Sequence, residues 1–133
     1  MKHSGSCLCG TVRFEIEGDF EGFFLCHCGR CRKGTGSAHG SNLFSSSAKL
    51  SWLSGQEHVI HFNLKPTRHS RSFCNICGSA MPYTMGPNNY LIVPAGALDS
   101  DLSIAPSAHI FTADRATWDH DLHQVESYEQ FPA

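Results

Sequence analysis

Cys26-His27-Cys28-Gly29-Arg30-Cys31 brings three thiols into six consecutive residues, in the pattern C-x-C-x-x-C. Zinc in proteins prefers four tetrahedral ligands, and thiolates are among the ligands it binds most often. A zinc site with only three protein ligands keeps one position for water or substrate, which is typical of catalytic zinc. We therefore predict an open zinc site in which Cys26, Cys28 and Cys31 are both the ligands and the catalytic residues.

The other four cysteines form two close pairs, Cys7 with Cys9 and Cys74 with Cys77. Four thiolates complete a tetrahedron, so these pairs predict a second, closed zinc site with a structural role. Two sulfurs on one zinc lie no more than about 4.6 Å apart, which a C-x-x-C turn followed by Gly78 can satisfy. On a flat strand Cys7 and Cys9 would lie about 6.6 Å apart, so this segment must bend, and Gly5 and Gly10 flank it.

The cysteine count of seven is odd, so disulfides could not pair every thiol. In a reducing compartment, clustered cysteines are more often metal ligands than disulfides. The first six residues are polar and lack the apolar core of a secretion signal, and the apolar stretch at 90–93 is too short to span a bilayer. We therefore expect a cytoplasmic protein with no membrane partner. The alternative is a secreted protein with three disulfides and one free thiol.

Length and charge limit the classes of function. A chain of 133 residues is long enough to bury a real core, and we expect a single zinc domain over residues 1–133. The net charge is -2, and the lysines and arginines are scattered, so we expect no nucleic-acid partner. These features favour small-molecule chemistry or a protein partner.

Short apolar stretches separated by glycine, proline and turn residues predict a mainly β fold. Residues 11–17 alternate strictly, with Val12, Phe14 and Ile16 on one face, as in a half-buried strand. Further strands are expected at 38–44, 58–62, 71–73, 90–93 and 109–112, and the short apolar run at 23–25 leads directly into the three-cysteine stretch. Three stretches are expected to differ: 50–53 forms a helical turn or an edge strand, 32–37 a glycine-rich loop, and 113–121 a helical turn around Trp118.

A histidine could fill the fourth position of the three-cysteine site and make it a second structural site, because three cysteines and one histidine are a common ligand set. Of the nine histidines, His39 and His109 are the better candidates. His27 is a poor candidate because a residue between two ligands tends to point away from the metal. We expect His27 to be exposed or hydrogen-bonded.

Three thiolates give a zinc site a negative formal charge, which weakens the metal as a Lewis acid and as a source of hydroxide. A thiol that enters the fourth position would lose its proton and could attack an electrophile such as an aldehyde carbon. The ligand set therefore favours carbon–sulfur chemistry. The same exposed thiolates are also open to oxidation.

Arg30, Arg32 and Lys33 place positive charge next to the predicted open site. These side chains could bind the carboxylates of a peptidic thiol and offset the charge of the thiolates. Alternatively, they form a solvated basic turn. The sequence leaves both possibilities open.

Several motifs together resemble those of one known family. They are GSCLCGTVRF at 5–14, CHCGRCRKGTGS at 26–37, RSFCNICGS at 71–79, PAGALD at 94–99 and the region from 109 to 118. In these motifs and in the order of its seven cysteines, the chain resembles the glutathione-dependent formaldehyde-activating enzyme family, also called the centromere-protein-V domain family. The resemblance spans nearly the whole chain, which lacks the basic tail expected of the chromatin-associated relatives.

The resemblance implies a mainly β fold of zinc-stapled, folded β-sheets, similar to a zinc-containing Rab exchange factor. It implies two zinc ions per chain, a structural one at Cys7, Cys9, Cys74 and Cys77 and a catalytic one at Cys26, Cys28 and Cys31. The implied activity is that of a carbon–sulfur lyase, which condenses glutathione, the co-substrate, with formaldehyde to S-hydroxymethylglutathione. The expected partners are thus a small-molecule thiol and aldehyde. The alternatives are a zinc-stabilised protein-binding module and a thiol redox sensor without lyase activity.

Overall fold

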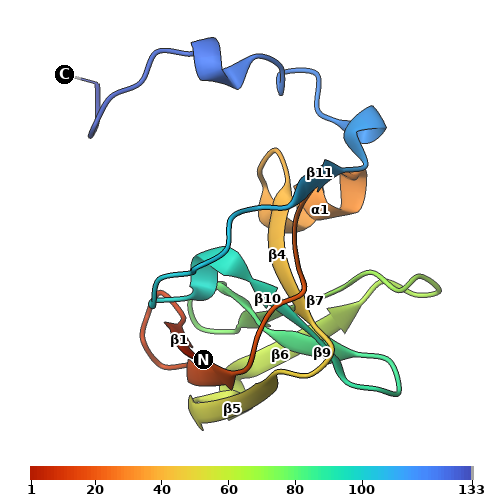
Figure 1. The fold of residues 1–133 in the computed structure, drawn as a ribbon, viewed down its shortest axis with the longest axis vertical. Coiled ribbons are helices and arrows are strands. Elements are labelled where there is room, and N and C mark those ends of the chain that lie inside the picture. The colour runs from red at the N-terminus through yellow and green to blue at the C-terminus, as the bar shows by residue number, and fades with distance from the viewer. Residues whose placement is uncertain (133) are drawn as a thin grey trace.

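The computed structural model describes residues 1–132 and confirms a mainly β fold (Figure 1). The strands are β1 Lys2–Ser6, β2 Arg13–Glu17, β3 Gly22–Cys26, β4 Gly40–Ser45, β5 Lys49–Ser54, β6 Val59–Asn63, β7 Ser70–Cys74, β8 Ala80–Met81, β9 Tyr83–Met85, β10 Tyr90–Pro94 and β11 Ala108–Ile110. The α-helix α1 spans Gly29–Thr35, and short 3₁₀ helices span Gln56–His58, Ala95–Ala97, Thr112–Asp114 and Leu122–Gln124.

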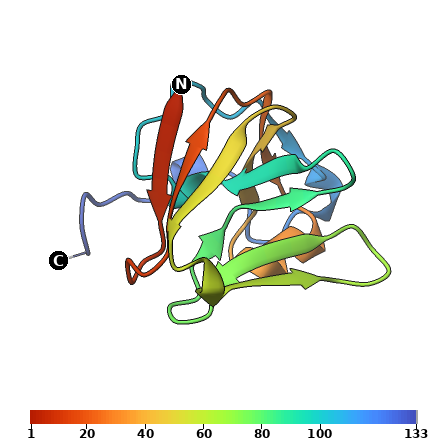
Figure 2. The same ribbon diagram turned by 90° about the horizontal axis from the view of Figure 1, so that it is seen from below.

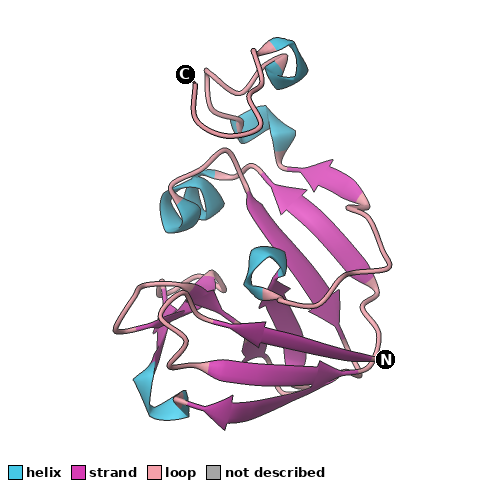
Figure 3. Cartoon of the chain, turned by 90° about the vertical axis from the view of Figure 1, so that its left-hand side faces the viewer, coloured by secondary structure: helices cyan, strands magenta, loops and turns pink. Residues whose placement is uncertain are grey.

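Within residues 1–132 the strands form three sheets, in the orders β1-β2-β5, β11-β3-β4-β10-β9 and β6-β7-β8. The pairing of β11 with β3 is parallel, and the other pairings are antiparallel. Because β11 lies beside β3, the chain returns at β11 to the neighbourhood of α1 (Figure 1). The sheets fold against one another around a shared core (Figure 3).

The core draws apolar side chains from each of these sheets. Phe14 of β2, Leu43 of β4 and Val93 of β10 are all fully buried, and Met81 of β8 packs with them. The half-buried strand predicted from the alternation at 11–17 is confirmed. Its three apolar side chains lie in the core, and the neighbouring charged residues face outward. The buried face of β2 therefore fixes how the first sheet lies on the other two.

Phe14→Ala is expected to lower the free energy of unfolding by about 3–5 kcal/mol, the usual cost of truncating a buried phenylalanine. The ring packs edge-on against Trp52 with 5.9 Å between ring centroids, and it leaves no room for a side chain at Gly5. Urea titration of the zinc-loaded protein measures the change, with Leu8→Ala as the control because Leu8 is 88% exposed. Equal losses in the two variants would contradict this packing.

The predicted strands at 11–17, 38–44, 58–62, 71–73, 90–93 and 109–112 overlap β2, β4, β6, β7, β10 and β11 respectively, and the apolar run at 23–25 lies within β3. Residues 50–53 belong to β5, so the edge-strand alternative is right, because β5 lies at the edge of its sheet. Around Trp118 the chain makes a single turn instead of a helix, with the N–H of Asp119 donating to the carbonyl of Ala116 at 3.0 Å. A 3₁₀ helix lies just before it, at Thr112–Asp114.

The prediction of a loop at 32–37 is wrong for its first part, because α1 continues to Thr35. Both ends of this seven-residue helix are capped. The sulfur of Cys28 accepts a hydrogen bond from the N–H of Cys31 at 3.4 Å, and Gly36 takes a left-handed conformation with φ of 65°. Caps of this kind satisfy free backbone groups and offset the low helix propensity of the internal glycines.

The segment after β11 continues beyond the sheets and ends away from them (Figure 1). It exposes several large apolar side chains, namely Phe111, Trp118, Leu122, Val125, Tyr128 and Phe131. In the described part of the chain, no helix has the length and apolar character needed to cross a membrane.

Candidate functional site

The first cysteine cluster joins two distant parts of the chain. The sulfur atoms of its members all lie within 4.8 Å of one another; the cluster consists of Cys7, Cys9, Cys74 and Cys77. The sulfurs of Cys7 and Cys9 are 3.5 Å apart, close to the separation of about 3.8 Å between thiolates on a tetrahedral zinc. This cluster can therefore hold a metal ion, and it links the end of β1 to the end of β7.

Tight turns hold each pair of sulfurs together. Gly10 and Gly78 both have φ of 78°, a conformation that favours glycine, and each donates its N–H to a cysteine carbonyl three or four residues earlier. Gly78 thus takes the turn conformation predicted for it, and the segment bends between Cys7 and Cys9 as predicted. Gly5 has a different role, because it lies within β1 where the ring of Phe14 occupies the space of a side chain.

Local hydrogen bonds prepare part of this cluster for ionisation. The hydroxyl and N–H of Ser79, with the N–H of Cys9, lower the pKa of Cys77 to about 5. Hydrogen bonds with Thr11 lower the pKa of Cys9, whereas burial raises the pKa of Cys7. A dication would favour ionisation of the buried thiol as well, because it offsets the charge of its neighbours.

The second cluster lies where β3 leads into α1. Cys26 ends β3, Cys28 caps α1 and Cys31 lies in its first turn. Their three sulfur atoms lie within 4.8 Å of one another, so the structure brings together the three residues predicted for the open site. Gly40 of β4 faces them, and a Cβ atom there would lie 3.5 Å from the Cβ of Cys31.

Electrostatics in this second cluster favour a bound cation. Burial, followed by the neighbouring thiols Cys26 and Cys28, raises the pKa of Cys31 far above its ordinary value. Burial also raises the pKa of Cys26. At Cys28 burial opposes ionisation, but the N–H of Cys31 and the other two thiols lower its pKa overall. Three such groups ionise together only if a positive charge lies among them, and a divalent metal ion fits that requirement.

Within residues 1–132, no histidine joins the sulfur atoms of the second cluster, so His39 and His109 do not complete it. The strand register explains why His109 does not join the second cluster. Cys26 pairs with Gly40 and with Ile110, whereas His109 pairs with Leu25. Because side chains alternate between the faces of a sheet, His109 projects from the face opposite to Cys26.

His27 is buried and hydrogen-bonded, so the expectation of an exposed side chain is wrong and that of a hydrogen-bonded one is right. Its Nδ1 lies 2.8 Å from the Oδ2 of Asp119. The imidazole of His27 also shares a hydrogen bond of 2.8 Å between its Nε2 and Nδ1 of His109. These contacts fasten the segment after β11 to the residue that lies between Cys26 and Cys28.

Asp119→Ala is expected to lower the free energy of unfolding by about 1–3 kcal/mol, because the buried Nδ1 of His27 loses the carboxylate that lies 2.8 Å from it. Arg115, 3.6 Å from the same carboxylate oxygen, loses its partner too. The measurement is urea unfolding at neutral pH. Asp114→Ala, an exposed carboxylate earlier in the same segment, serves as the control. An unchanged unfolding midpoint in Asp119→Ala would refute the anchoring role.

The three basic residues predicted beside the open site all lie on α1 but differ in exposure. Arg30 and Lys33 are exposed, and Arg32 is half-buried, with its Nε buried without a hydrogen-bond partner in the described part of the chain. The guanidinium of Arg32 lies back over the start of the helix, 3.8 Å from where a Cβ atom of Gly29 would be. Arg30 is therefore free to contact a ligand in solution, as is Lys33.

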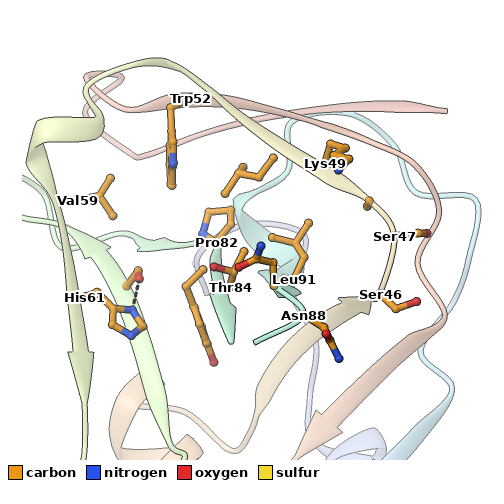
Figure 4. A pocket seen from close by; sticks show the side chains of 15 residues that line it. Ser46, Ser47, Lys49, Trp52, Val59, His61, Pro82, Thr84, Asn88 and Leu91 are labelled. Carbon is orange, nitrogen blue, oxygen red and sulfur yellow. Dashed lines mark hydrogen bonds between the residues drawn. The ribbon is translucent and has the colours of Figure 1, made fainter. Parts of the chain in front are cut away.

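A cleft of about 610 Å³ lies beside β5, β6 and β9, with Trp52, Val59 and Pro82 in its wall (Figure 4). His61 points into it and shares a hydrogen bond of 2.9 Å with Ser72. Within residues 1–132, no cysteine lines this cleft, so it is separate from both cysteine clusters.

Tyr83 forms one side of the cleft and is also influenced electrostatically by the second cluster. Its ring centroid lies 5.6 Å from that of His61, and burial followed by the charge of Cys31 raises its pKa to about 12. Sequence reasoning missed both Tyr83 and Asp119. Tyr83 lies in a strand too short to show a sequence pattern, and Asp119 is far from the cysteines along the chain.

Comparison with known proteins agrees with this arrangement. The family model of the glutathione-dependent formaldehyde-activating enzyme matches residues 2–114. A relative from Halomonas elongata, provisionally named a glutathione-dependent formaldehyde-activating enzyme, is 31% identical over 138 residues, covering 98% of this chain and 85% of its own. A crystal structure of a Rhodobacter sphaeroides protein, solved as a structural-genomics target, is similar in fold with a TM-score of 0.59 and 21% identity, over 80% of this chain and 98% of that chain. The chain belongs to the glutathione-dependent formaldehyde-activating enzyme family.

Proposed function

We propose that this protein is a zinc-dependent carbon–sulfur lyase that forms and cleaves an adduct between glutathione, or a similar thiol, and formaldehyde or another small aldehyde. The observation that carries the proposal is the second cluster, in which three sulfurs meet and no fourth metal-ligating side chain of residues 1–132 joins them. Family membership supports a role in glutathione and formaldehyde chemistry. The uncrosslinked cysteines favour the reducing cytoplasm as the place of the reaction.

Both clusters have the donor set and the spacing that zinc requires. Four thiols in the first cluster suit a closed structural site, and three in the second suit a site with one open position. We therefore assign two zinc ions to each chain. A zinc ion in the second cluster would favour the deprotonated form of a thiol that enters the open position.

The residues of the second cluster and its surroundings would position the reactants. The sulfur of glutathione forms a bond to the carbonyl carbon of formaldehyde while the carbon–oxygen double bond becomes single. The thiol proton ends on the oxygen, which gives S-hydroxymethylglutathione, and the reverse sequence cleaves the adduct. Because Cys28 caps α1 and Cys26 ends β3, the sulfurs that define the open position are held by regular structure on both sides.

The reverse reaction provides the test. S-hydroxymethylglutathione is formed in advance, diluted with zinc-loaded protein, and the released formaldehyde is captured by a hydrazine trap. We expect release in proportion to protein concentration and saturable by the adduct, above the spontaneous rate. Release at the spontaneous rate, whatever the concentration of zinc-loaded protein, would contradict the proposed function.

A zinc-stabilised protein-binding module is the second candidate. It is favoured by the exposed apolar side chains after β11, among them Trp118, Tyr128 and Phe131. Exposed apolar groups of this kind often mark contact surfaces. A binding module would hold both zinc ions tightly against a mild chelator and would respond to neither glutathione nor formaldehyde.

A further inference from the structure

Helix α1 packs against the start of β7, and the closest approach is at Gly34. A Cβ atom at Gly34 would lie 3.7 Å from Cδ of Arg71 and 3.9 Å from Nε2 of His69. Figure 2 shows the β6–β7 hairpin on the side of the molecule where α1 lies. Two basic side chains that are remote from α1 in sequence therefore lie against the helix that carries Cys31.

Arg30 stands on the same face of α1 as Gly34, because residues four apart lie one above the other on a helix. Arg30 therefore lies on the side of α1 that faces His69 and Arg71. The pKa of His69 agrees with this placement: burial lowers it first, and the charges of Arg30 and Arg71 lower it further. We call these three residues the basic cluster.

No carboxylate in the described part of the chain neutralises the basic cluster. The ion pairs within residues 1–132 involve Lys2, His27, His58 and Arg115, and none involves Arg30, His69 or Arg71. The guanidinium of Arg71 is held 5.2 Å from the ring centroid of Phe73, so it is positioned without an acidic partner. The charges of Arg30 and Arg71 both act on His69, so the basic cluster repels further positive charge, and a bound anion would be attracted to it.

We propose that the basic cluster binds a carboxylate of the thiol substrate, with Arg30 and Arg71 as the contacts that select a thiol bearing a carboxylate over a simple alkyl thiol. This inference rests on the proposed function, because it names the substrate class of the same site. Gly34, where Arg71 and His69 approach α1, is three residues from Cys31, so the basic cluster lies on the part of the helix surface next to that thiol. Guanidinium groups bind carboxylates through paired, charge-assisted hydrogen bonds, and glutathione carries two carboxylates.

The test measures binding of S-methylglutathione, which keeps both carboxylates but has no free thiol and cannot react. Calorimetric titration of the zinc-loaded protein is expected to give saturable binding that weakens as salt increases from low to physiological concentration. Arg71→Gln and Arg30→Gln are each expected to weaken this binding about tenfold. Arg71→Lys is expected to recover part of the loss, because lysine keeps the charge but not the paired geometry.

Arg13→Gln is the matched control, since Arg13 is an exposed arginine of β2 outside the basic cluster. Metal analysis shows for each variant whether both zinc sites remain intact. Undetectable binding of S-methylglutathione to the wild type, or equal binding by wild type, Arg71→Gln and Arg30→Gln, would overturn the inference. If adduct cleavage is absent but S-methylglutathione binding still depends on Arg71, the lyase function fails and the carboxylate site stands. If adduct cleavage occurs but S-methylglutathione binding does not depend on Arg71, the carboxylate site fails and the lyase function stands.

Discussion

Cys77→Ser is expected to leave most of the protein unfolded at neutral pH, even with excess zinc. The first cluster joins the end of β1 to the end of β7, so a metal held there would fix the first sheet against the third. Structural zinc sites contribute about 10–16 kcal/mol of binding free energy, as much as the whole stability of a typical domain of about 5–15 kcal/mol. Because Cys77 is itself only half-buried, the loss of its side chain from the core adds little to this effect.

Circular dichroism and metal analysis of purified Cys77→Ser measure the result. The matched control is Ile76→Ser, which changes the neighbouring residue of the same turn but removes no ligand; Ile76 is 56% exposed. The control is expected to stay folded with two zinc ions. A folded Cys77→Ser protein that still binds two zinc ions would show that the first cluster is not a structural metal site.

Cys28→Ser is expected to have the second large effect, which is on activity and not on folding. The variant is expected to bind one zinc ion fewer and to lose more than about 100-fold in adduct formation and cleavage, since two thiolates hold zinc poorly. Folding is expected to survive because serine is a favoured helix cap, and its hydroxyl can accept the N–H of Cys31 as the sulfur of Cys28 does.

Metal analysis, circular dichroism and the formaldehyde-trap assay, applied to the same preparation, separate these effects. Ser37→Ala, an exposed residue just past α1, is the control for changes near the helix. An unfolded Cys28→Ser protein would count against an open catalytic site, because the second cluster would then stabilise the fold. Full activity in the folded variant would exclude Cys28 from the site.

Local patterns made much of the fold and both cysteine clusters predictable. The alternation at 11–17 identified a buried strand face, and the spacing of the seven cysteines divided them into the groups of four and three that the structure forms. The glycine after Cys77 also indicated the turn that closes the first cluster. These features depend on residues close together in the chain, where spacing alone limits the geometry.

The remaining features depend on contacts between distant segments. Strand β1 has no apolar alternation, because its inward positions are His3 and Gly5, and the small size of Gly5 makes room for Phe14. The contact of Asp119 with His27 requires the parallel pairing of β11 with β3, which no local pattern indicates. Likewise, Arg71 meets α1 only because two separate elements pack together, so sequence reasoning placed the basic side chains of the site on one helix alone.

Exchange spectroscopy by NMR tests the central claim most directly, by measuring the rate at which formaldehyde and its glutathione adduct interconvert at equilibrium. The spontaneous rate without protein is the baseline. Zinc-loaded wild type is expected to accelerate the interconversion in proportion to its concentration, and folded Cys28→Ser is expected to leave it at the baseline. An unchanged rate with fully zinc-loaded wild type, or equal acceleration by Cys28→Ser, would contradict the assignment of the second cluster as the site of this reaction.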